Sequence, residues 1–230
     1  MWDNPRLLNA AAGFLVGLAA LAFAAAAACW LLHSALFPVR TVELLTVLKQ
    51  APRAEVGATL ARAGRGNFFA APIDELRAAL ERLPWVRRAT VRRVWPDGLE
   101  VSLEEHVALA RWAAGGLVNQ QGERFAGEAA GLPLFNGPPG SEAEVARRYA
   151  RFSPLLAPLA SPIERLTLSA RLAWEVKLAN GTELKLGRDA DAAEAKLARF
   201  VAAYEANELA PLGAGVDLRY PNGFSVRVKG

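Results

Sequence analysis

The sequence RATVRRVWPDGLEVSLE at residues 88–104 decides the fold of the first half of the chain. Apolar and polar residues alternate on both sides of the turn residues 96–98, Pro-Asp-Gly, and this pattern predicts a β-hairpin. Its polar face carries arginines before the turn and glutamates after it, so opposite charges can pair across the hairpin and fix its register. The residues predicted to share the apolar face are Ala89, Val91, Trp95, Leu99, Val101 and Leu103.

Two helices are predicted before this hairpin. Residues 55–63 place apolar side chains on one helical face and end at a Gly-Arg-Gly break. Pro72 and the two acids after it open a second helix, in which apolar residues recur every three or four positions. An apolar run at residues 38–50 precedes both helices. The predicted order is therefore β-α-α-β-β, ending near His106.

Residues 10–32 carry no charge. A helix of about 23 residues is about 35 Å long, enough to cross a hydrocarbon core of about 30 Å. The run therefore predicts one transmembrane signal anchor. Arg6 and the N-terminal amine precede it, so the positive-inside rule places the short tail at residues 1–9 in the cytoplasm.

Two other interpretations of this apolar run stay open. The alanines at 24–28 fit a signal-peptidase site, and Cys29 after them resembles a lipoprotein cleavage site. The length of the run and the apolar residues that follow Cys29 favour the uncleaved anchor. Gly13 and Gly17 have the spacing of a helix-packing motif, a spacing that also arises by chance in an alanine-rich segment.

Composition excludes several classes of site. The 230 residues are 53% hydrophobic and 22% charged, which is typical of a globular chain. The net charge of +4 comes from scattered arginines, which favour solvated faces over a nucleic-acid surface. Cys29 is the one cysteine and His33 and His106 are the two histidines, so neither a disulfide nor a usual zinc site can form.

The second half of the sequence predicts a β-rich domain with a mixed sheet and flanking helices. The pattern at 116–125 is strand, turn, strand, and an Asn-Gly turn at 180–181 joins two alternating segments. Helices are predicted at 142–159 and after Asp189, which can cap the second one. A last hairpin turns at 221–223.

No catalytic constellation is predicted. Glu104 and His106 share one face of a strand, an arrangement that suits acid–base chemistry. A simpler explanation is that these residues form the charged end of a strand, which lies opposite Arg88 and Arg92. The sequence has no P-loop, nucleophile elbow or S-x-x-K motif. We therefore expect no enzyme activity, no cofactor, no metal and no small-molecule substrate.

The last hairpin predicts a binding role instead. A terminal strand is often a sheet edge, and its unpaired N–H and C=O groups can be completed by a strand of another protein. The alternative is that a loop covers this strand or that it packs centrally. The residues expected on or beside this edge are Arg219, Phe224, Ser225, Val226, Arg227 and Val228.

Three segments resemble the FtsQ/DivIB family of bacterial cell-division proteins. They are RRVWPDGLEVSLEEHVALARW at 92–112, LVN-x-x-G-x-x-F at 117–125 and VDLRYPNGF at 216–224. The resemblance implies an α+β chain with a cytoplasmic tail at 1–9, a signal anchor at 10–32, a POTRA domain at 38–106 and an FtsQ-type β domain at 107–230.

The resemblance also implies a function. Members of this family are non-enzymatic scaffolds that link early and late division proteins at the septum. They are single-pass, type II proteins of the inner membrane, with periplasmic C-terminal domains. The implied partners are FtsB and FtsL, which bind by strand addition at the C-terminal edge, and other division proteins such as FtsW, FtsI, FtsN and FtsK.

The same resemblance implies the partner-binding residues. Arg219 and Tyr220 match the closing motif of the family, and Arg171 is expected in the strand before the Asn-Gly hairpin. This chain departs from other members at 221–222 and at Phe224, where they carry small or acidic residues. The complete predicted set is Arg171, Arg219, Tyr220, Asn222, Gly223, Phe224, Ser225 and Val226.

Two alternatives come from other classes of protein. A POTRA-containing protein-translocation or outer-membrane assembly component would continue into barrel strands of about ten alternating residues, which residues 1–230 do not contain. An anchored cell-wall hydrolase would need a nucleophile or a metal set, which the sequence lacks.

Overall fold

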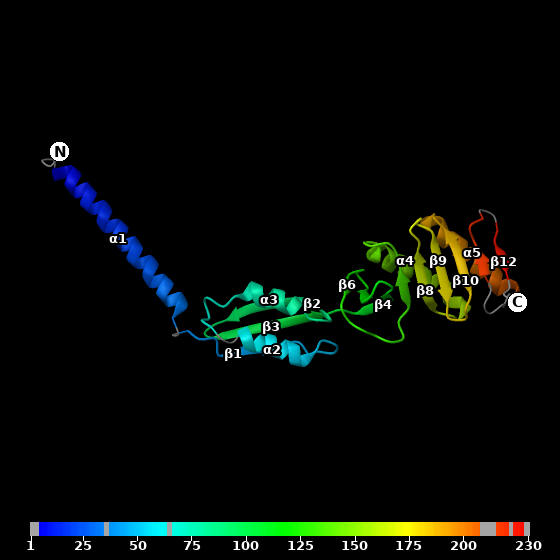
Figure 1. Ribbon diagram of the computed structural model, residues 1–230, viewed down its shortest axis with the longest axis horizontal. Helices are drawn as coiled ribbons and strands as arrows, with labels where there is room; N and C mark the ends of the chain where they lie inside the picture. The colour runs from blue at the N-terminus through cyan, green and yellow to red at the C-terminus, as the bar shows by residue number, and fades with distance from the viewer. Residues whose placement is uncertain (1–4, 35–36, 64–65, 208–214, 221–222, 228–230) are drawn as a thin grey trace. The chain divides into compact units, whose positions relative to one another are not determined.

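The computed structural model describes residues 5–34, 37–63, 66–207, 215–220 and 223–227. The chain divides into two compact units, Met1–Glu105 and His106–Gly230, each with its own hydrophobic core. Both units combine helices with sheets (Figure 1), so the predicted α+β class is confirmed.

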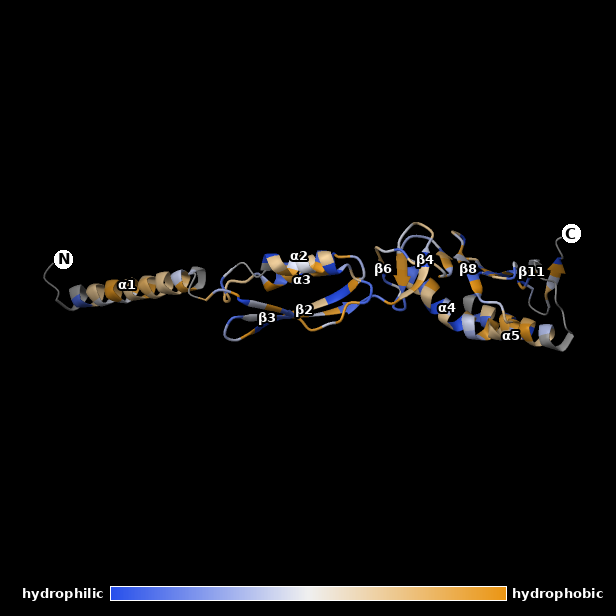
Figure 2. Ribbon diagram, turned by 90° about the horizontal axis from the view of Figure 1, so that it is seen from below, coloured by the Kyte–Doolittle hydropathy of each residue, from blue (hydrophilic) through white to orange (hydrophobic). Residues whose placement is uncertain are grey.

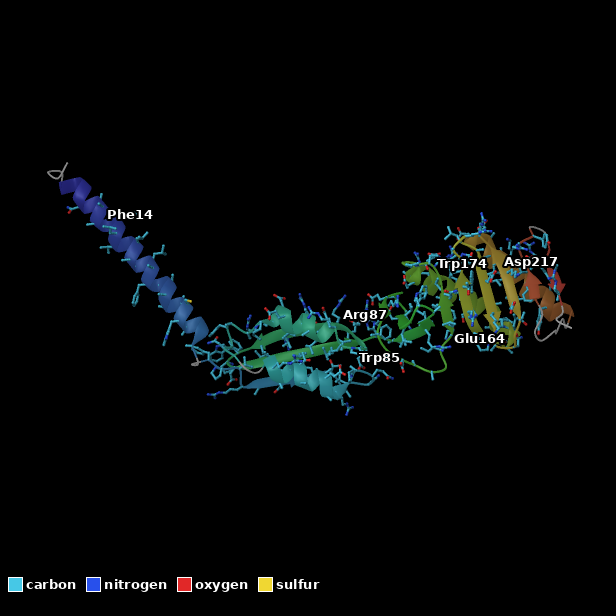
Figure 3. All side chains as sticks on the ribbon, in the orientation of Figure 1. Phe14, Trp85, Arg87, Glu164, Trp174 and Asp217 are labelled. Carbon is cyan, nitrogen blue, oxygen red and sulfur yellow. The ribbon has the colours of Figure 1, made fainter. Side chains whose placement is uncertain are left out.

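The apolar run forms helix α1 (Pro5–His33). Among the described residues it is the one helix long and apolar enough to cross a membrane, and its apolar window covers Asn9–Leu31. Hydrophobic residues surround the helix (Figure 2), and Phe14 projects from it without protein packed against it (Figure 3). Phe23 is likewise exposed. Apolar side chains exposed all round a helix suit lipid as the surrounding medium.

The predicted β-α-α-β-β order follows α1. Its elements are β1 (Thr41–Leu44), α2 (Arg53–Ala63), α3 (Ile73–Glu81), β2 (Val86–Val94) and β3 (Gly98–Glu105). The sheet order is β1-β3-β2, with β1 parallel and β2 antiparallel to β3. Both helices lie on one face of this sheet (Figure 2), where the core gathers around residues such as Leu80 and Val101.

Opposite charges pair across the hairpin, as predicted. Arg92 lies opposite Glu100, and its Nε is 2.7 Å from a carboxylate oxygen of that residue. At the other end the register shifts between Val86 and Arg88, and Arg87 reaches Glu104 at 2.6 Å. The bulge therefore moves the second ion pair from Arg88 to Arg87.

The predicted apolar face fails at Trp95. Leu99, Val101 and Leu103 are buried on β3, and Ala89 is buried on β2. Trp95 is 79% exposed because β2 ends at Val94, so the indole belongs to the turn and no longer follows the alternation of the strand.

The second unit is built on one nine-stranded sheet. Its order is β12-β11-β10-β9-β8-β7-β4-β5-β6, with parallel pairs β10–β11, β4–β7 and β7–β8. The strands are β4 (Ala108–Trp112), β5 (Leu117–Asn119), β6 (Arg124–Phe125), β7 (Leu134–Asn136), β8 (Ile163–Leu168), β9 (Trp174–Leu178), β10 (Glu183–Gly187), β11 (Gly215–Asp217) and β12 (Ser225–Arg227).

Two helices cover one face of this sheet (Figure 2). They are α4 (Glu142–Leu156), which continues into the short helix η1 (Ala157–Leu159), and α5 (Ala190–Asn207). Between helices and sheet lies a core in which Phe135, Phe152 and Leu197 are fully buried. Arg148 of α4 joins the helices by ion pairs with residues of α5.

The carboxylate of Glu105 connects the last strand of the first unit to the segment before α2. It accepts the backbone N–H of Lys49 at 3.0 Å, Gln50 at 3.0 Å and Ala51 at 2.7 Å, and so ties the end of β3 to the segment before α2. Desolvation acts to raise the pKa of Glu105, but the three N–H donors together outweigh it and hold the pKa below its ordinary value.

We therefore expect Glu105→Gln to destabilise the first unit by about 1–2 kcal/mol, after allowance for solvent screening of this partly exposed group. Hydrogen exchange of the amides at 49–51 should accelerate in the full-length variant. Because the folded pKa is the lower one, this stabilisation is complete above the pKa of the unfolded glutamate and is lost as the pH falls through the folded pKa. The difference between variant and parent should therefore shrink in acid.

Glu104→Gln is the matched control, because Glu104 is half exposed and has an ion pair with Arg87. Its expected cost is below about 1 kcal/mol, with exchange at 49–51 unchanged. Equal effects of the two substitutions would contradict the role assigned to Glu105.

Candidate partner-binding edge

Strand β12 lies at the end of the nine-stranded sheet (Figure 1). Within the part of the chain that the structure describes, it pairs with β11 on one side and with no strand on the other. Ser225, Val226 and Arg227 are all exposed. The prediction of an edge strand at the last hairpin is thus met by the described residues.

The neighbouring strand β11 is fixed by the core. Val216 lies opposite Leu184 of β10 and is 3% exposed, and Leu218 just beyond the strand is 2% exposed. The backbone N–H of Leu218 also donates to the carbonyl oxygen of Lys185 at 2.9 Å. The edge that β12 presents therefore rests on a rigid support.

One row of apolar side chains crosses the sheet and ends at the edge. The register places in this row, in order, Leu166, Val176, Leu184, Val216 and Val226. The first four are buried, whereas Val226 is 41% exposed because no strand follows it in the row among the described residues. A further strand at this edge would extend the row by one side chain and cover Val226.

The next row carries charges. Glu175, Lys185, Asp217 and Ser225 lie opposite one another in successive strands. Because successive residues of a strand point to opposite faces, this charged row lies on the face away from the helices. An added strand would thus meet an apolar position and a polar position alternately.

Asp217 orients the chain that leaves β11 (Figure 3). Its carboxylate accepts the backbone N–H of Arg219 at 3.0 Å and a two-pronged contact from the Arg219 guanidinium, with Nε at 2.8 Å and Nη2 at 2.5 Å. The hydrogen bond from the Arg219 side chain is the main cause that lowers the pKa of Asp217, and the same pairing raises the pKa of Arg219. Arg219 is therefore a charged group held in place at the start of the turn.

The residues in and beside the turn differ in exposure and in the space around them. Tyr220 is 55% exposed immediately after the Arg219 contact, which makes it an accessible aromatic side chain beside the edge. Gly223 has open space around it, so a larger side chain would be tolerated sterically. Asn222 lies outside the described residues.

Phe224 points inward rather than toward a partner. Its ring is half buried and packs edge-to-face on Phe200 of α5, with ring centroids 5.4 Å apart. The side chain therefore holds the start of β12 against the helix. It can support the edge without touching a bound strand.

Arg171 does not lie in a strand, contrary to the sequence-based expectation. It occupies the turn between β8 and β9, where it is exposed and Leu172 after it has a φ of 59°. The strand directions place this turn at the same end of the sheet as the turn after β11, with β10 and β11 between β9 and β12. Three strand spacings of about 4.8 Å therefore separate Arg171 from the edge.

The one acid–base pair considered from the sequence is used for structure. His106 Nδ1 lies 2.9 Å from Nδ2 of Asn119, and its ring stacks on Phe125 at 4.1 Å. Asn119 is fully buried, and its Oδ1 accepts the backbone N–H of Glu123 at 2.8 Å. These contacts close the turn between β5 and β6 and hold the imidazole of His106 beside it.

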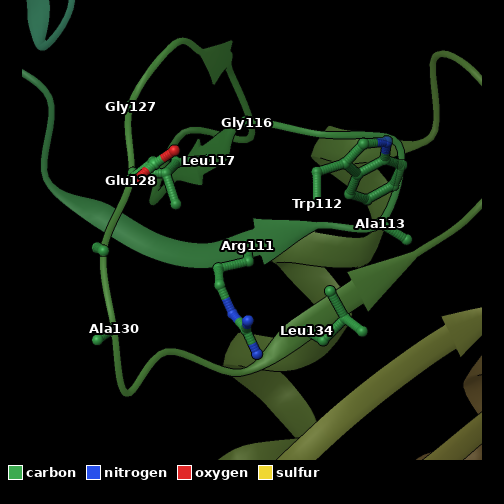
Figure 4. Close-up of a pocket in the computed structure, with 10 residues that line it drawn as sticks. Arg111, Trp112, Ala113, Gly116, Leu117, Gly127, Glu128, Ala130 and Leu134 are labelled. Carbon is green, nitrogen blue, oxygen red and sulfur yellow. The ribbon is translucent and has the colours of Figure 1, made fainter.

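A surface hollow of about 620 Å³ lies between β4 and the loop at 127–130 (Figure 4). Arg111 and Glu128 line opposite sides of it. Its lining contains no serine, cysteine or histidine, so it offers no nucleophile beside a base. The described residues also contain no group of three or more His, Cys, Asp or Glu side chains that could hold a metal ion.

Taken together, an apolar N-terminal helix, a β-α-α-β-β domain and a second domain whose described residues end the sheet at β12 define a class of protein: an α+β chain that carries a POTRA domain behind an apolar helix. Two family models match the chain, "POTRA domain, FtsQ-type" at residues 37–106 and "Cell division protein FtsQ/DivIB, C-terminal" at residues 110–219. The chain belongs to the FtsQ/DivIB family of cell division proteins.

Curated relatives extend the match over the whole chain. It is 41% identical over 244 residues to cell division protein FtsQ of Burkholderia pseudomallei, covering 100% of this chain and 95% of the relative. FtsQ of Nitrosospira multiformis is 40% identical over 235 residues, with 99% of each covered. FtsQ of Neisseria gonorrhoeae is 34% identical, with 99% and 95% covered. Together with α1, these relatives indicate a single-pass inner-membrane division protein.

Sequence reasoning missed two features of the edge. The hairpin of β11 and β12 was predicted, but the parallel pairing of β11 with β10, which places that hairpin at the end of the sheet, came only from the structure. The role of Asp217 was also missed, although its spacing of two residues from Arg219 on one face of an extended segment was a usable signal.

We expect Phe224→Ala to loosen β12 and cost about 1–2 kcal/mol, less than a fully buried phenylalanine because the ring is half exposed. Hydrogen exchange at 224–227 should accelerate in the full-length protein. Val226→Ala is the control, since Val226 is exposed and its truncation should change exchange at 224–227 very little. Unchanged exchange in the Phe224 variant would contradict the anchoring role.

Proposed function

We propose that this protein is a non-enzymatic scaffold of the division machinery that binds FtsB and FtsL through the free edge of β12. The single observation that carries the proposal is the apolar row that is buried across four strands and open at Val226. Membership of the FtsQ/DivIB family supports the division role. The partners themselves come from the family resemblance.

Strand addition explains how such an edge would bind. The outer N–H and C=O groups of β12 would pair with the backbone of the incoming strand, and alternate side chains of that strand would cover Val226. Ser225 and Arg227 point to the opposite face, where polar contacts suit a solvated rim. Backbone pairing would give affinity, and the alternation would select the sequence of the partner.

Tyr220 is the proposed anchor of this interface. Exposed tyrosines that become buried are among the side chains that most often dominate binding energy. The contact between Asp217 and Arg219 fixes the backbone just before Tyr220, so less conformational entropy is lost when the ring is buried. Arg171, at the same end of the sheet, would contact a part of the partner that extends past the edge strand.

We further propose a type II orientation, with residues 1–9 in the cytoplasm and both folded units in the periplasm at the septum. Arg6 before the apolar run supports this orientation through the positive-inside rule. FtsW, FtsI, FtsN and FtsK are proposed as further division partners on the family resemblance alone.

We expect Tyr220→Ala to weaken binding of a co-expressed FtsB/FtsL pair at least about tenfold, since truncating a hot-spot tyrosine typically costs 2 kcal/mol or more. The measurement is co-purification followed by titration of the full-length protein in detergent. Tyr220→Phe keeps the ring and should retain most of the affinity.

Trp95→Ala is the matched control, because it removes a more exposed aromatic side chain from the other unit of the chain. This variant should bind the pair like the parent protein. If the Tyr220→Ala protein binds the FtsB/FtsL pair with unchanged affinity, and hydrogen exchange at 215–217 is also unchanged, the proposal that the pair binds at the β12 edge is contradicted.

A fluorescent tag at the N-terminus should give midcell bands, and a uniform membrane signal would argue against the division-site assignment.

A further inference from the structure

One end of the first unit carries an exposed apolar surface, which we call the aromatic tip. It is formed by Phe37, Phe69, Val94 and Trp95, of which Trp95 is 79% and Phe69 41% exposed. Phe37 and Phe69 contact each other edge-to-face, with ring centroids 5.3 Å apart. Several large apolar side chains exposed together are unusual on a soluble surface and mark a place where something else packs.

The tip is held rigidly by Arg93. Its Nε donates to the carbonyl oxygen of Phe68 at 2.9 Å, and its Nη2 donates to those of Ala71 at 2.9 Å and Phe69 at 3.1 Å. This guanidinium therefore joins the end of β2 to the loop before α3. Because carbonyl groups are neutral, the bonds fix the position of the arginine without neutralising its charge.

The turn of the hairpin is tied to the segment that enters β1. The backbone N–H of Arg40 donates to the carbonyl oxygen of Asp97 at 2.9 Å, and the two side chains form an ion pair at 3.7 Å. The backbone N–H of Phe68 donates to the carbonyl oxygen of Phe37 at 2.7 Å. Residues at 37–40, 67–71 and 93–97 thus form one connected surface.

The covalent chain keeps this surface near the membrane. The apolar window of α1 ends at Leu31, and Phe37 follows six residues later. Six residues span at most about 20 Å even when fully extended. The side-chain amide of Asn67, next to Phe68, also donates to the carbonyl oxygen of Ser34 at 2.7 Å. Whatever the tilt of the domain, the tip stays close to the headgroups around α1.

We propose that the aromatic tip inserts into the headgroup region of the bilayer that α1 spans, as a second membrane contact. Tryptophan is enriched at that depth because its ring has an apolar body and a polar N–H. Arg93 supplies a positive charge beside the rings, which suits lipid phosphate groups. The contact would limit the swing of the first unit about the end of α1 and so orient it relative to the membrane.

The test uses the full-length protein in nanodiscs that hold one copy each, made of phosphatidylethanolamine and phosphatidylglycerol. Cys29 is replaced by alanine, and a single nitroxide is placed at Ala70, next to Phe69, or at Val47. Val47 is the matched control site because it is 79% exposed and follows the far end of β1. The readout is the collision rate of each nitroxide with a water-soluble nickel chelate.

We expect the nitroxide at residue 70 to be protected from the chelate and the one at residue 47 to be open to it. Trp95→Ala should abolish the protection, because losing one buried aromatic ring lowers the ratio of inserted to free domain at least about tenfold. Val47→Ala should leave it unchanged. If Trp95→Ala alters hydrogen exchange in β2 and β3, a second variant replaces it. This variant is Phe69→Ser with the nitroxide at residue 97, and it should likewise lose the protection from the chelate.

Three outcomes would overturn the proposal. They are equal collision rates at residues 70 and 47, protection that survives Trp95→Ala in a folded domain, and protection that appears only with two copies in a disc. The last outcome would assign the tip to a second copy of this chain. No division partner is present in the discs, so these results are independent of those for Tyr220.

Discussion

The parallel pairing of β11 with β10 is the constraint on which the candidate site depends. It buries Val216 and Leu218 and carries the sheet register to the last strand, so that Val226 continues a row of buried side chains. The three residues of β12 itself are all exposed, and Phe224 just before them is half buried. The position of this edge strand is therefore set by its neighbour, while no other strand among the described residues pairs with its outer backbone groups, which is the condition that strand addition requires.

Arginine has two separate roles in the first unit. Arg87 and Arg92 pair with glutamates across the hairpin, which fixes register on a solvated face but adds little stability. Arg93, one residue further along the strand, donates to three backbone carbonyl groups and connects two loops. For Arg92 and Arg93 the difference follows from the alternation of the strand, because neighbouring residues face opposite sides of the sheet. Arg87 reaches Glu104 because the register shifts between Val86 and Arg88.

The two surfaces described above belong to separate units with separate cores. The aromatic tip lies close in sequence to the anchor, and the β12 edge lies near the other end of the chain. A substitution on either surface changes side chains that are largely exposed, so each can be altered without unfolding the other unit. This separation fits a scaffold in which membrane attachment and partner recognition are distinct tasks.

The amino-acid sequence by itself determined the membrane-spanning helix, the order of elements in the first unit and the pairing of charges across the hairpin, because each depends on local periodicity or on the uncharged length of a segment. The closing motif also pointed to the last hairpin. Only the tertiary structure decided that Arg171 lies in a turn, that Phe224 packs on Phe200 and that Trp95 is exposed. Alternation within a strand says which residues share a face, but it does not say which strand lies beside it or which face a helix covers. That neighbour relation is what leaves Val226 open at the edge of the sheet.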